Sequence, residues 1–196
     1  MGKVKSAFET AMEKAGKIGR LSSEEKENLK NEEMVKSILG EFYKGNLDSN
    51  GLWQKLKGIP SSSLKMVQIN LIDSLSLVNA QIEFKMKKEG ILAVETLKEK
   101  PNTAVIDSIL DLIEVLQKEY QGMKESVAED LKREIEKNPQ LRMQPVRTPN
   151  GKTVMQAALS VDEAVKVRLS EFLSVHEKRY SVEFNSLIEK FKIAVR

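Results

Sequence analysis

Between Thr103 and Lys137, apolar residues recur at alternating steps of three and four positions over three heptads. They are Ile106, Ile109, Ile113, Leu116, Tyr120, Met123 and Val127. Because an α-helix turns once in about 3.6 residues, this spacing places all these side chains on one stripe of one helix. A seven-residue repeat is typical of helices that pack as a left-handed supercoil. Since Asn138 and Pro139 end the pattern, the sequence predicts a helix of 35 residues, which is about 50 Å long.

Two other segments carry apolar residues at helical spacing over a comparable length. The first begins with serines at 61–63, and its stripe consists of Leu64, Leu71, Leu75, Val78 and Ile82. We expect this helix to kink or stop near Gly90, after which a helical period continues to Pro101. The second begins at Ser160, where Glu163 completes a capping box. Its stripe consists of Val161, Val165, Leu169, Phe172, His176, Tyr180, Phe184, Leu187 and Phe191.

These three segments predict an all-α fold, an elongated antiparallel bundle of three long helices with shorter N-terminal helices. The alternative is a helical hairpin that buries its remaining apolar stripe in a dimer. Shorter helical patterns occupy residues 3–19, 22–45 and 49–57. We therefore expect residues 1–58 to pack on a bundle formed by residues 61–196.

Helical spacing is interrupted within residues 139–159. Residues 148–151 read Thr-Pro-Asn-Gly, which suits a type I turn followed by a residue at positive φ. That geometry joins two antiparallel strands. We expect a small β-hairpin near 141–155, or an ordered loop, inserted in the bundle.

The insertion carries three basic residues, Arg142, Arg147 and Lys152. Loops on a rigid scaffold often carry recognition, so these side chains are candidates for binding an acidic protein partner or a phosphate group. The run Gly-Lys-Thr at 151–153 is also found in phosphate-binding loops. Such a loop needs another glycine five residues before Gly151, where this chain has Val146. We therefore interpret the run as a structural turn.

Trp53 is the single tryptophan and lies between Leu52 and Leu56 on a short predicted helix. One large ring often fixes a short helix that is unstable alone. We favour a role for Trp53 in docking the N-terminal region onto the bundle. The other interpretation is that Trp53 anchors a binding surface for a partner.

Composition excludes several classes of site. The chain has no cysteine, so it has no disulfide, no thiolate nucleophile and no Cys-ligated metal. The most apolar stretch, residues 64–84, is broken by polar side chains and does not predict a membrane span. Because Glu9 and Glu13 follow the first residues in place of an apolar core, we expect no secretory signal and a cytoplasmic protein.

Charge is distributed with little asymmetry. The net charge is +3, from 32 basic and 29 acidic residues. The last third, residues 139–196, has 10 basic and 6 acidic residues and is the most basic part. A protein that binds phosphates non-specifically concentrates its basic residues on one face, whereas acids are interspersed here. Nucleic acid is therefore the less favoured partner.

No set of residues suggests catalysis, a metal or a cofactor. His176, the single histidine, lies on the apolar stripe between Phe172 and Tyr180, where we expect it to be packed and hydrogen-bonded. A carboxylate-bridged metal pair needs Glu-x-x-His motifs on two helices, which one histidine does not provide. Asp107 and Asp111, with Glu114, lie opposite the apolar stripe and are interpreted as a solvated face.

The N-terminal residues Gly2-Lys3-Val4-Lys5-Ser6-Ala7, followed by Glu9, resemble the start of a family of uncharacterised bacterial helical proteins of about this size. The resemblance covers about the first dozen residues. It implies a bacterial cytoplasmic origin and no substrate, cofactor or catalytic residue.

These observations lead to a hypothesis of function. We expect a non-catalytic protein–protein interaction or scaffold protein, with self-association as one form of it. The alternative is a nucleic-acid or ribonucleoprotein-binding protein that uses the basic C-terminal third and the tip of the 139–159 insertion. A third hypothesis is an enzyme with a site around His176 and Tyr180.

Overall fold

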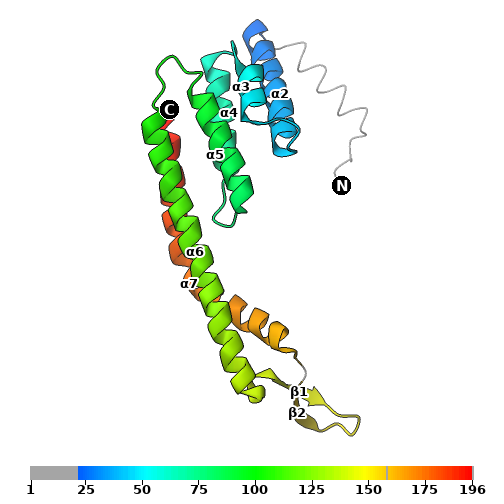
Figure 1. The fold of residues 1–196 in the computed structure, drawn as a ribbon. Helices are drawn as coiled ribbons and strands as arrows, with labels where there is room; N and C mark the ends of the chain where they lie inside the picture. The colour runs from blue at the N-terminus through cyan, green and yellow to red at the C-terminus, as the bar shows by residue number, and fades with distance from the viewer. Residues whose placement is uncertain (1–21, 158, 196) are drawn as a thin grey trace, which may run out of the picture. The chain divides into compact units, whose positions relative to one another are not determined.

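The computed structural model describes residues 22–157 and 159–195, which form an all-α fold with a small antiparallel sheet (Figure 1). Its α-helices are α2 (Ser23–Tyr43), α3 (Ser49–Leu56), α4 (Ser61–Asp73), α5 (Gln81–Glu95), α6 (Thr103–Lys137) and α7 (Val161–Ala194). Between α6 and α7 lie a 3-10 helix, η1 (Pro139–Arg142), and the strands β1 (Met143–Arg147) and β2 (Thr153–Ala157). None of the described helices has both the length and the apolar character to cross a membrane. The helix predicted at residues 3–19 lies outside the described residues.

The predictions for the last two long segments are confirmed. Helix α6 begins at Thr103 and ends at Lys137, as the apolar repeat and the Asn-Pro pair predict. Helix α7 returns along α6 in the opposite direction (Figure 1). The rings of Tyr120 on α6 and Tyr180 on α7 lie 5.3 Å apart between centroids. The two helices therefore form an antiparallel pair joined by η1 and the hairpin.

The first predicted long helix is divided in the structure into α4 and α5. Helix α4 ends at Asp73, and the loop 74–80 separates it from α5. The backbone N–H of Ser76 donates to Oδ1 of Asn79 at 2.6 Å, and the N–H of Val78 donates to Oγ of Ser76 at 3.2 Å. Such side-chain to backbone bonds replace helical ones, which is why Ser and Asn favour turns. Spacing alone does not reveal this break.

The division changes the exposure of two predicted core residues. Val78 and Ile82 were expected on the apolar stripe, but they are 62% and 87% exposed. Leu75 and Leu77, within the loop, are buried instead. The amino group of Lys87 donates to the carbonyl of Ser74 at 2.6 Å and fixes the loop from the α5 side.

The carboxylates of Asp107 and Asp111 hold a lysine from α5. The Nζ atom of Lys88 lies within ion-pair distance of both side chains. Partial burial lowers the pKa of Lys88, but hydrogen bonds with Asp111 and Asp107 outweigh this effect and raise the pKa above its usual value. The face interpreted as solvated therefore also carries a contact between α5 and α6.

The core around α6 and α7 is wider than the predicted seam. On α6 the buried residues are Ile106, Leu110, Ile113, Leu116, Gln117, Tyr120 and Ile135, and on α7 they are Ala164, Phe184, Ile188 and Phe191. Leu110 and Gln117 lie beside the seam, where sequence spacing did not place the core. Gln117 is covered because its Nε2 atom donates to the carbonyl of Ser76 at 2.6 Å. Residues from the 74–80 loop thus supply a second neighbour for α6.

A separate core forms among α2, α3, the first part of α4 and the second half of α5. Its largest members are Phe42, Leu52, Leu56, Leu71 and Ile91, which are fully buried. Gly90 was expected to kink or stop its helix, but α5 continues through it to Glu95. A Cβ atom at Gly90 would lie 2.6 Å from Cζ of Phe42, so the glycine allows the ring to approach the α5 backbone.

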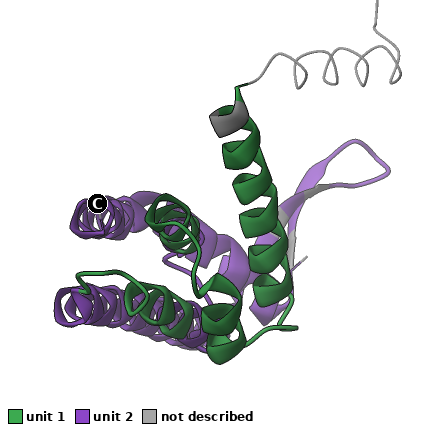
Figure 2. Ribbon diagram, turned by 90° about the horizontal axis from the view of Figure 1, so that it is seen from above, with its two compact units in different colours: residues 1–71, 89–101 green, residues 72–88, 102–196 purple. Residues whose placement is uncertain are grey.

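The chain divides into two compact units, coloured separately in Figure 2. Unit 1 comprises Met1–Leu71, of which the first 21 residues are not described, and Glu89–Pro101; unit 2 comprises Ile72–Lys88 and Asn102–Arg196. The boundaries fall inside α4 and α5 and differ from the expected division into 1–58 and 61–196. The reason for the α5 boundary is that its second half packs on Phe42 and Leu52, which belong to the N-terminal helices.

The capping box predicted at the start of α7 is present. The N–H of Ser160 donates to the carboxylate of Glu163 at 2.8 Å, and the N–H of Glu163 donates to Oγ of Ser160 at 3.3 Å. We expect Ser160→Ala to lower the free energy of unfolding by about 1 kcal/mol, because it removes the acceptor at the N-cap. Ser174→Ala, in the middle of the same helix, should instead be neutral or stabilising, because alanine has the higher helix propensity. Urea denaturation followed by circular dichroism measures both, and equal effects would contradict the capping role.

Candidate functional site: the hairpin and the hollow beside α6

The predicted hairpin is present between residues 143 and 157. Strands β1 and β2 are antiparallel, with Met143 opposite Ala157 and Arg147 opposite Thr153. The N–H of Thr148 donates to the carbonyl of Lys152 at 2.8 Å, and Gly151 adopts φ of +77°. The Gly-Lys-Thr run therefore forms the end of a tight turn, as the sequence predicts.

One face of this hairpin is uncovered. Because side chains alternate along a strand and paired residues share a face, this face comprises Met143, Pro145, Arg147, Thr153 and Met155. All five are exposed, Met143 by 40% and Met155 by 59%. A two-stranded sheet is marginally stable in water unless an apolar face is packed against something. The hairpin face, as we call these five residues, is therefore a candidate docking surface.

The basic residues predicted for this region lie in two places, at the turn of the hairpin and in η1. Arg147 and Lys152 are both exposed at the turn end of the hairpin, within a stretch, residues 139–159, that contains no acidic residue. Arg142 lies in η1, before β1, and is only half-exposed. Its Nε atom is buried without a hydrogen-bond partner among the described residues. The structure therefore places two of the three basic candidates together at the tip.

Trp53 belongs to unit 1 and does not share a unit with the hairpin. On α3, Leu52 and Leu56 are fully buried, whereas Trp53 is half-buried with Nζ of Lys57 5.3 Å from its ring centroid. Trp53 also borders a shallow hollow of about 580 Å³, together with Leu92 and Ala93 of α5. The two leucines thus provide most of the packing that was expected of the tryptophan.

His176 is exposed, so the prediction that it is packed in the core is wrong. Its ring stacks on Phe172, with centroids 4.1 Å apart. The hollow of about 250 Å³ around it is lined by α7 residues and by Met123 of α6. Among the described residues, α6 is the one other helix that lines this hollow, and the exposed side of α7 here includes Val175 and His176. Within residues 22–157 and 159–195 no acidic or histidine cluster has the arrangement of a metal site.

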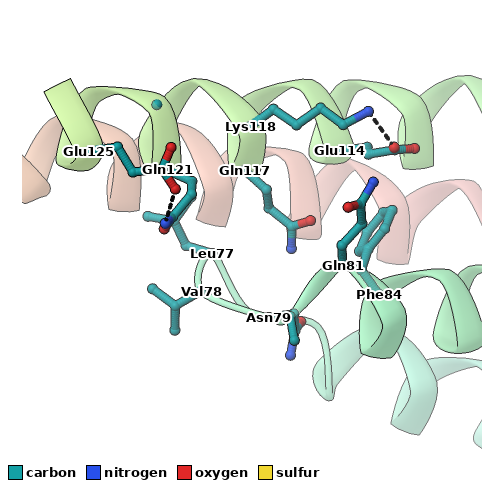
Figure 3. Close-up of a pocket in the computed structure, with 12 residues that line it drawn as sticks. Leu77, Val78, Asn79, Gln81, Phe84, Glu114, Gln117, Lys118, Gln121 and Glu125 are labelled. Atoms are coloured by element: carbon teal, nitrogen blue, oxygen red, sulfur yellow. Dashed lines mark hydrogen bonds and ion pairs between the residues drawn. The ribbon is translucent and has the colours of Figure 1, made fainter.

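A second hollow of unit 2 lies between α6 and the segment that precedes and begins α5 (Figure 3). Its volume is about 480 Å³. The loop and α5 contribute Leu77, Val78, Asn79, Ala80, Gln81 and Phe84, and α6 contributes Glu114, Gln117, Lys118, Gln121, Gly122 and Glu125. We call this site the α6 hollow.

The polar side chains that α6 contributes to the hollow are bonded to one another in pairs. Nζ of Lys118 lies 2.6 Å from Oε1 of Glu114, and Nε2 of Gln121 donates to Oε1 of Glu125 at 2.7 Å (Figure 3). Gly122 has no side chain, and apart from its chain neighbours and the adjacent backbone of α6 no described atom lies within 4 Å of the position its Cβ would take. The helix surface is consequently open at this point.

Sequence reasoning identified Arg147 and Lys152 but missed the apolar part of the hairpin face. The signal was available, because Met143, Pro145 and Met155 fall at alternate positions on either side of the turn. The α6 hollow had no such signal, since it depends on the break between α4 and α5. Comparisons of the chain with protein-family models, with curated proteins and with solved structures find no match.

Proposed function

We propose that the protein is a non-catalytic interaction or scaffold protein that docks partners, including copies of itself, through the hairpin face. The observation that carries this proposal is the exposure of Met143 and Met155 beside Arg147 on a sheet of two strands. Methionine and arginine are both enriched at protein interfaces, and methionine adapts to irregular surfaces. Burial of this face by a partner would remove apolar surface from water and stabilise the hairpin.

The outer faces of the long helices support the same function. Val105 and Leu112 on α6 are exposed and seven residues apart, as are Val175 and Val182 on α7. Seven-residue spacing is the repeat that helices use to pack against other helices. We propose that α6 and α7 wind around each other as a coiled coil. The exposed apolar residues just named would then contact a helix of a partner.

We place this interaction in the bacterial cytoplasm. The support is that residues 2–9 resemble the start of a family of bacterial proteins. These residues lie outside the part of the chain that the structure describes.

The function is tested with a matched pair of substitutions in β2. Met155→Asp places a charge on the hairpin face, whereas Val154→Asp places the same charge on the opposite face of the same strand. We expect Met155→Asp to weaken association about tenfold or more, because the carboxylate must be desolvated in an interface. Val154→Asp should change association by much less. Sedimentation velocity reports association between copies, and affinity capture with the purified variants reports a different partner.

Two results would contradict the proposal. One is equal retention of partners by Met155→Asp and the wild type, which would show that the hairpin face is not the docking surface. The other is a wild-type chain that stays monomeric at all concentrations and captures no protein.

The acid-free stretch 139–159, with exposed Arg147 and Lys152, favours nucleic acid as a second candidate partner. Binding of this kind rests on phosphate contacts and is strongest at low salt. Electrophoretic mobility shifts with RNA and DNA at about 50 mM salt test it. A shift that weakens with salt and is lost in Arg147→Glu would support this candidate, and the absence of any shift would exclude it.

A further inference from the structure

The α6 hollow has an apolar floor and an apolar rim. Phe84 and Leu77 are buried at its base, while Val78 lines it from the loop and is 62% exposed. Ile82, which follows the lining residue Gln81 on α5, is the most exposed large apolar residue described, but it does not itself line the hollow. An apolar side chain as exposed as that of Val78 at the edge of a concave site with an apolar floor is typical of a surface that another molecule covers.

The charges of the α6 hollow favour a basic occupant. Two carboxylates, Glu114 and Glu125, line it against the single ammonium group of Lys118. Both acids lie on α6 and are held by neighbours on the same helix. The exposed side-chain amide of Gln81 adds a donor and an acceptor of the kind that pair with a polypeptide backbone. The site therefore suits a protein segment with apolar and basic side chains, rather than a metal ion or an anion.

The hairpin face has the complementary chemistry. It presents Met143, Pro145 and Met155 beside Arg147, and Lys152 lies at the adjoining turn, with no acid in residues 139–159. Methionine side chains fill irregular hollows and make favourable contacts with aromatic rings such as that of Phe84. We propose that the α6 hollow binds the hairpin of a second copy of this chain. This inference rests on the proposed function and names the partner.

The hairpin of the same copy does not reach the hollow. Between Glu125, at the end of the hollow, and Lys137, where α6 ends, the helix rises by about 18 Å. The hairpin begins only after η1, which contacts both α6 and α7 at that end. Each copy therefore presents one hairpin and one hollow at different places on unit 2. A hairpin and a hollow can therefore pair in two ways, reciprocally in a two-fold dimer or head to tail in rings or chains of copies.

Gly122 provides a way to close the hollow without disturbing the fold. It lies in the interior of α6 with open space around its Cβ position. Gly122→Arg fills this space and adds a positive charge that repels the basic hairpin. Gly122→Ala is the matched control, because it adds one methyl group and leaves the hollow open. Both substitutions replace glycine by a better helix former, so neither should unfold the protein.

The experiment is sedimentation velocity of the full-length chain over a wide concentration range. We expect the wild type to form dimers or larger species, and Gly122→Ala to behave in the same way. Gly122→Arg and Met155→Asp should each associate about tenfold more weakly or not at all. When the two variants are mixed, the intact hairpin of Gly122→Arg fits the intact hollow of Met155→Asp. The mixture should form a one-to-one dimer that does not grow further.

The outcomes separate this inference from the proposed function. If the wild type is monomeric at every concentration, or if Gly122→Arg associates normally, the α6 hollow does not hold the hairpin. If Met155→Asp alone loses association, the hairpin face is still a docking surface, but it binds another site of this chain or another protein. A mixture of the two variants that stays monomeric also overturns the inference. Circular dichroism melting curves no lower than the wild-type curve show that both variants are folded.

Discussion

Gly90→Val is expected to destabilise unit 1 by about 2–3 kcal/mol, at the upper end of the range for overpacking a core. The valine Cβ would lie 2.6 Å from Cζ and 3.1 Å from Cε1 of Phe42, and 3.4 Å from Cδ2 of Leu52. Both neighbours are fully buried, so neither can move into solvent to relieve the contact. The gain in helix propensity over glycine, about 0.5 kcal/mol, is too small to compensate.

Trp53 is the only tryptophan and belongs to unit 1, so its fluorescence during urea denaturation reports this change directly. Gly40→Val is the matched control, because Gly40 lies inside α2 and no described atom beyond its chain neighbours and the adjacent helix backbone lies within 4 Å of its Cβ position. We expect the control to be neutral or slightly stabilising. If Gly90→Val is as stable as Gly40→Val, the close approach of Phe42 to α5 is wrong.

Phe191→Ala is expected to lower the free energy of unfolding of unit 2 by about 3–5 kcal/mol. Phe191 is fully buried on the face of α7 that also buries Phe184 and Ile188, so alanine leaves a cavity in this core. Ile193→Ala, two residues further along α7, should change stability by no more than about 0.5 kcal/mol, because Ile193 is exposed. Urea denaturation followed by circular dichroism measures both variants. Similar losses for the two would contradict the assigned core face of α7.

The parts of the fold that could be predicted from the sequence are those specified by nearby residues. The repeat in residues 103–137 and the Asn-Pro pair after it define α6 by themselves. The Ser160–Glu163 box marks the start of α7, and residues 148–151 specify the turn of the hairpin. In each case the hydrogen bonds that make the element join residues within about four positions, so the sequence shows them.

The parts that could not be predicted depend on contacts between distant segments. The helix predicted to run from residue 61 breaks at 74–80, where the loop is fixed by Lys87 and Gln117. Gly90 reads as a helix breaker, but Phe42, which lies 48 positions earlier in the chain, gives it a packing role. His176 has the spacing of a core residue, yet it is exposed, and in the part of the chain that the structure describes the hollow beside it is lined from another helix by Met123 of α6 alone.

The candidate site likewise has one part that could be predicted from the sequence and one part that could not. Arg147 and Lys152 could be placed on the hairpin from the turn alone. The α6 hollow could not, because its two walls come from segments that spacing assigns to continuous helices. Val78 lines this hollow because the break turns it out of the core.

The most direct test of the account measures amide hydrogen exchange across the whole chain at concentrations below and above those at which it associates or binds a partner. The account predicts that exchange in residues 143–157 slows about tenfold or more in the associated state, because the interface stabilises a hairpin that is marginal alone. Unchanged exchange in these residues, with protection appearing elsewhere as the complex forms, would contradict it.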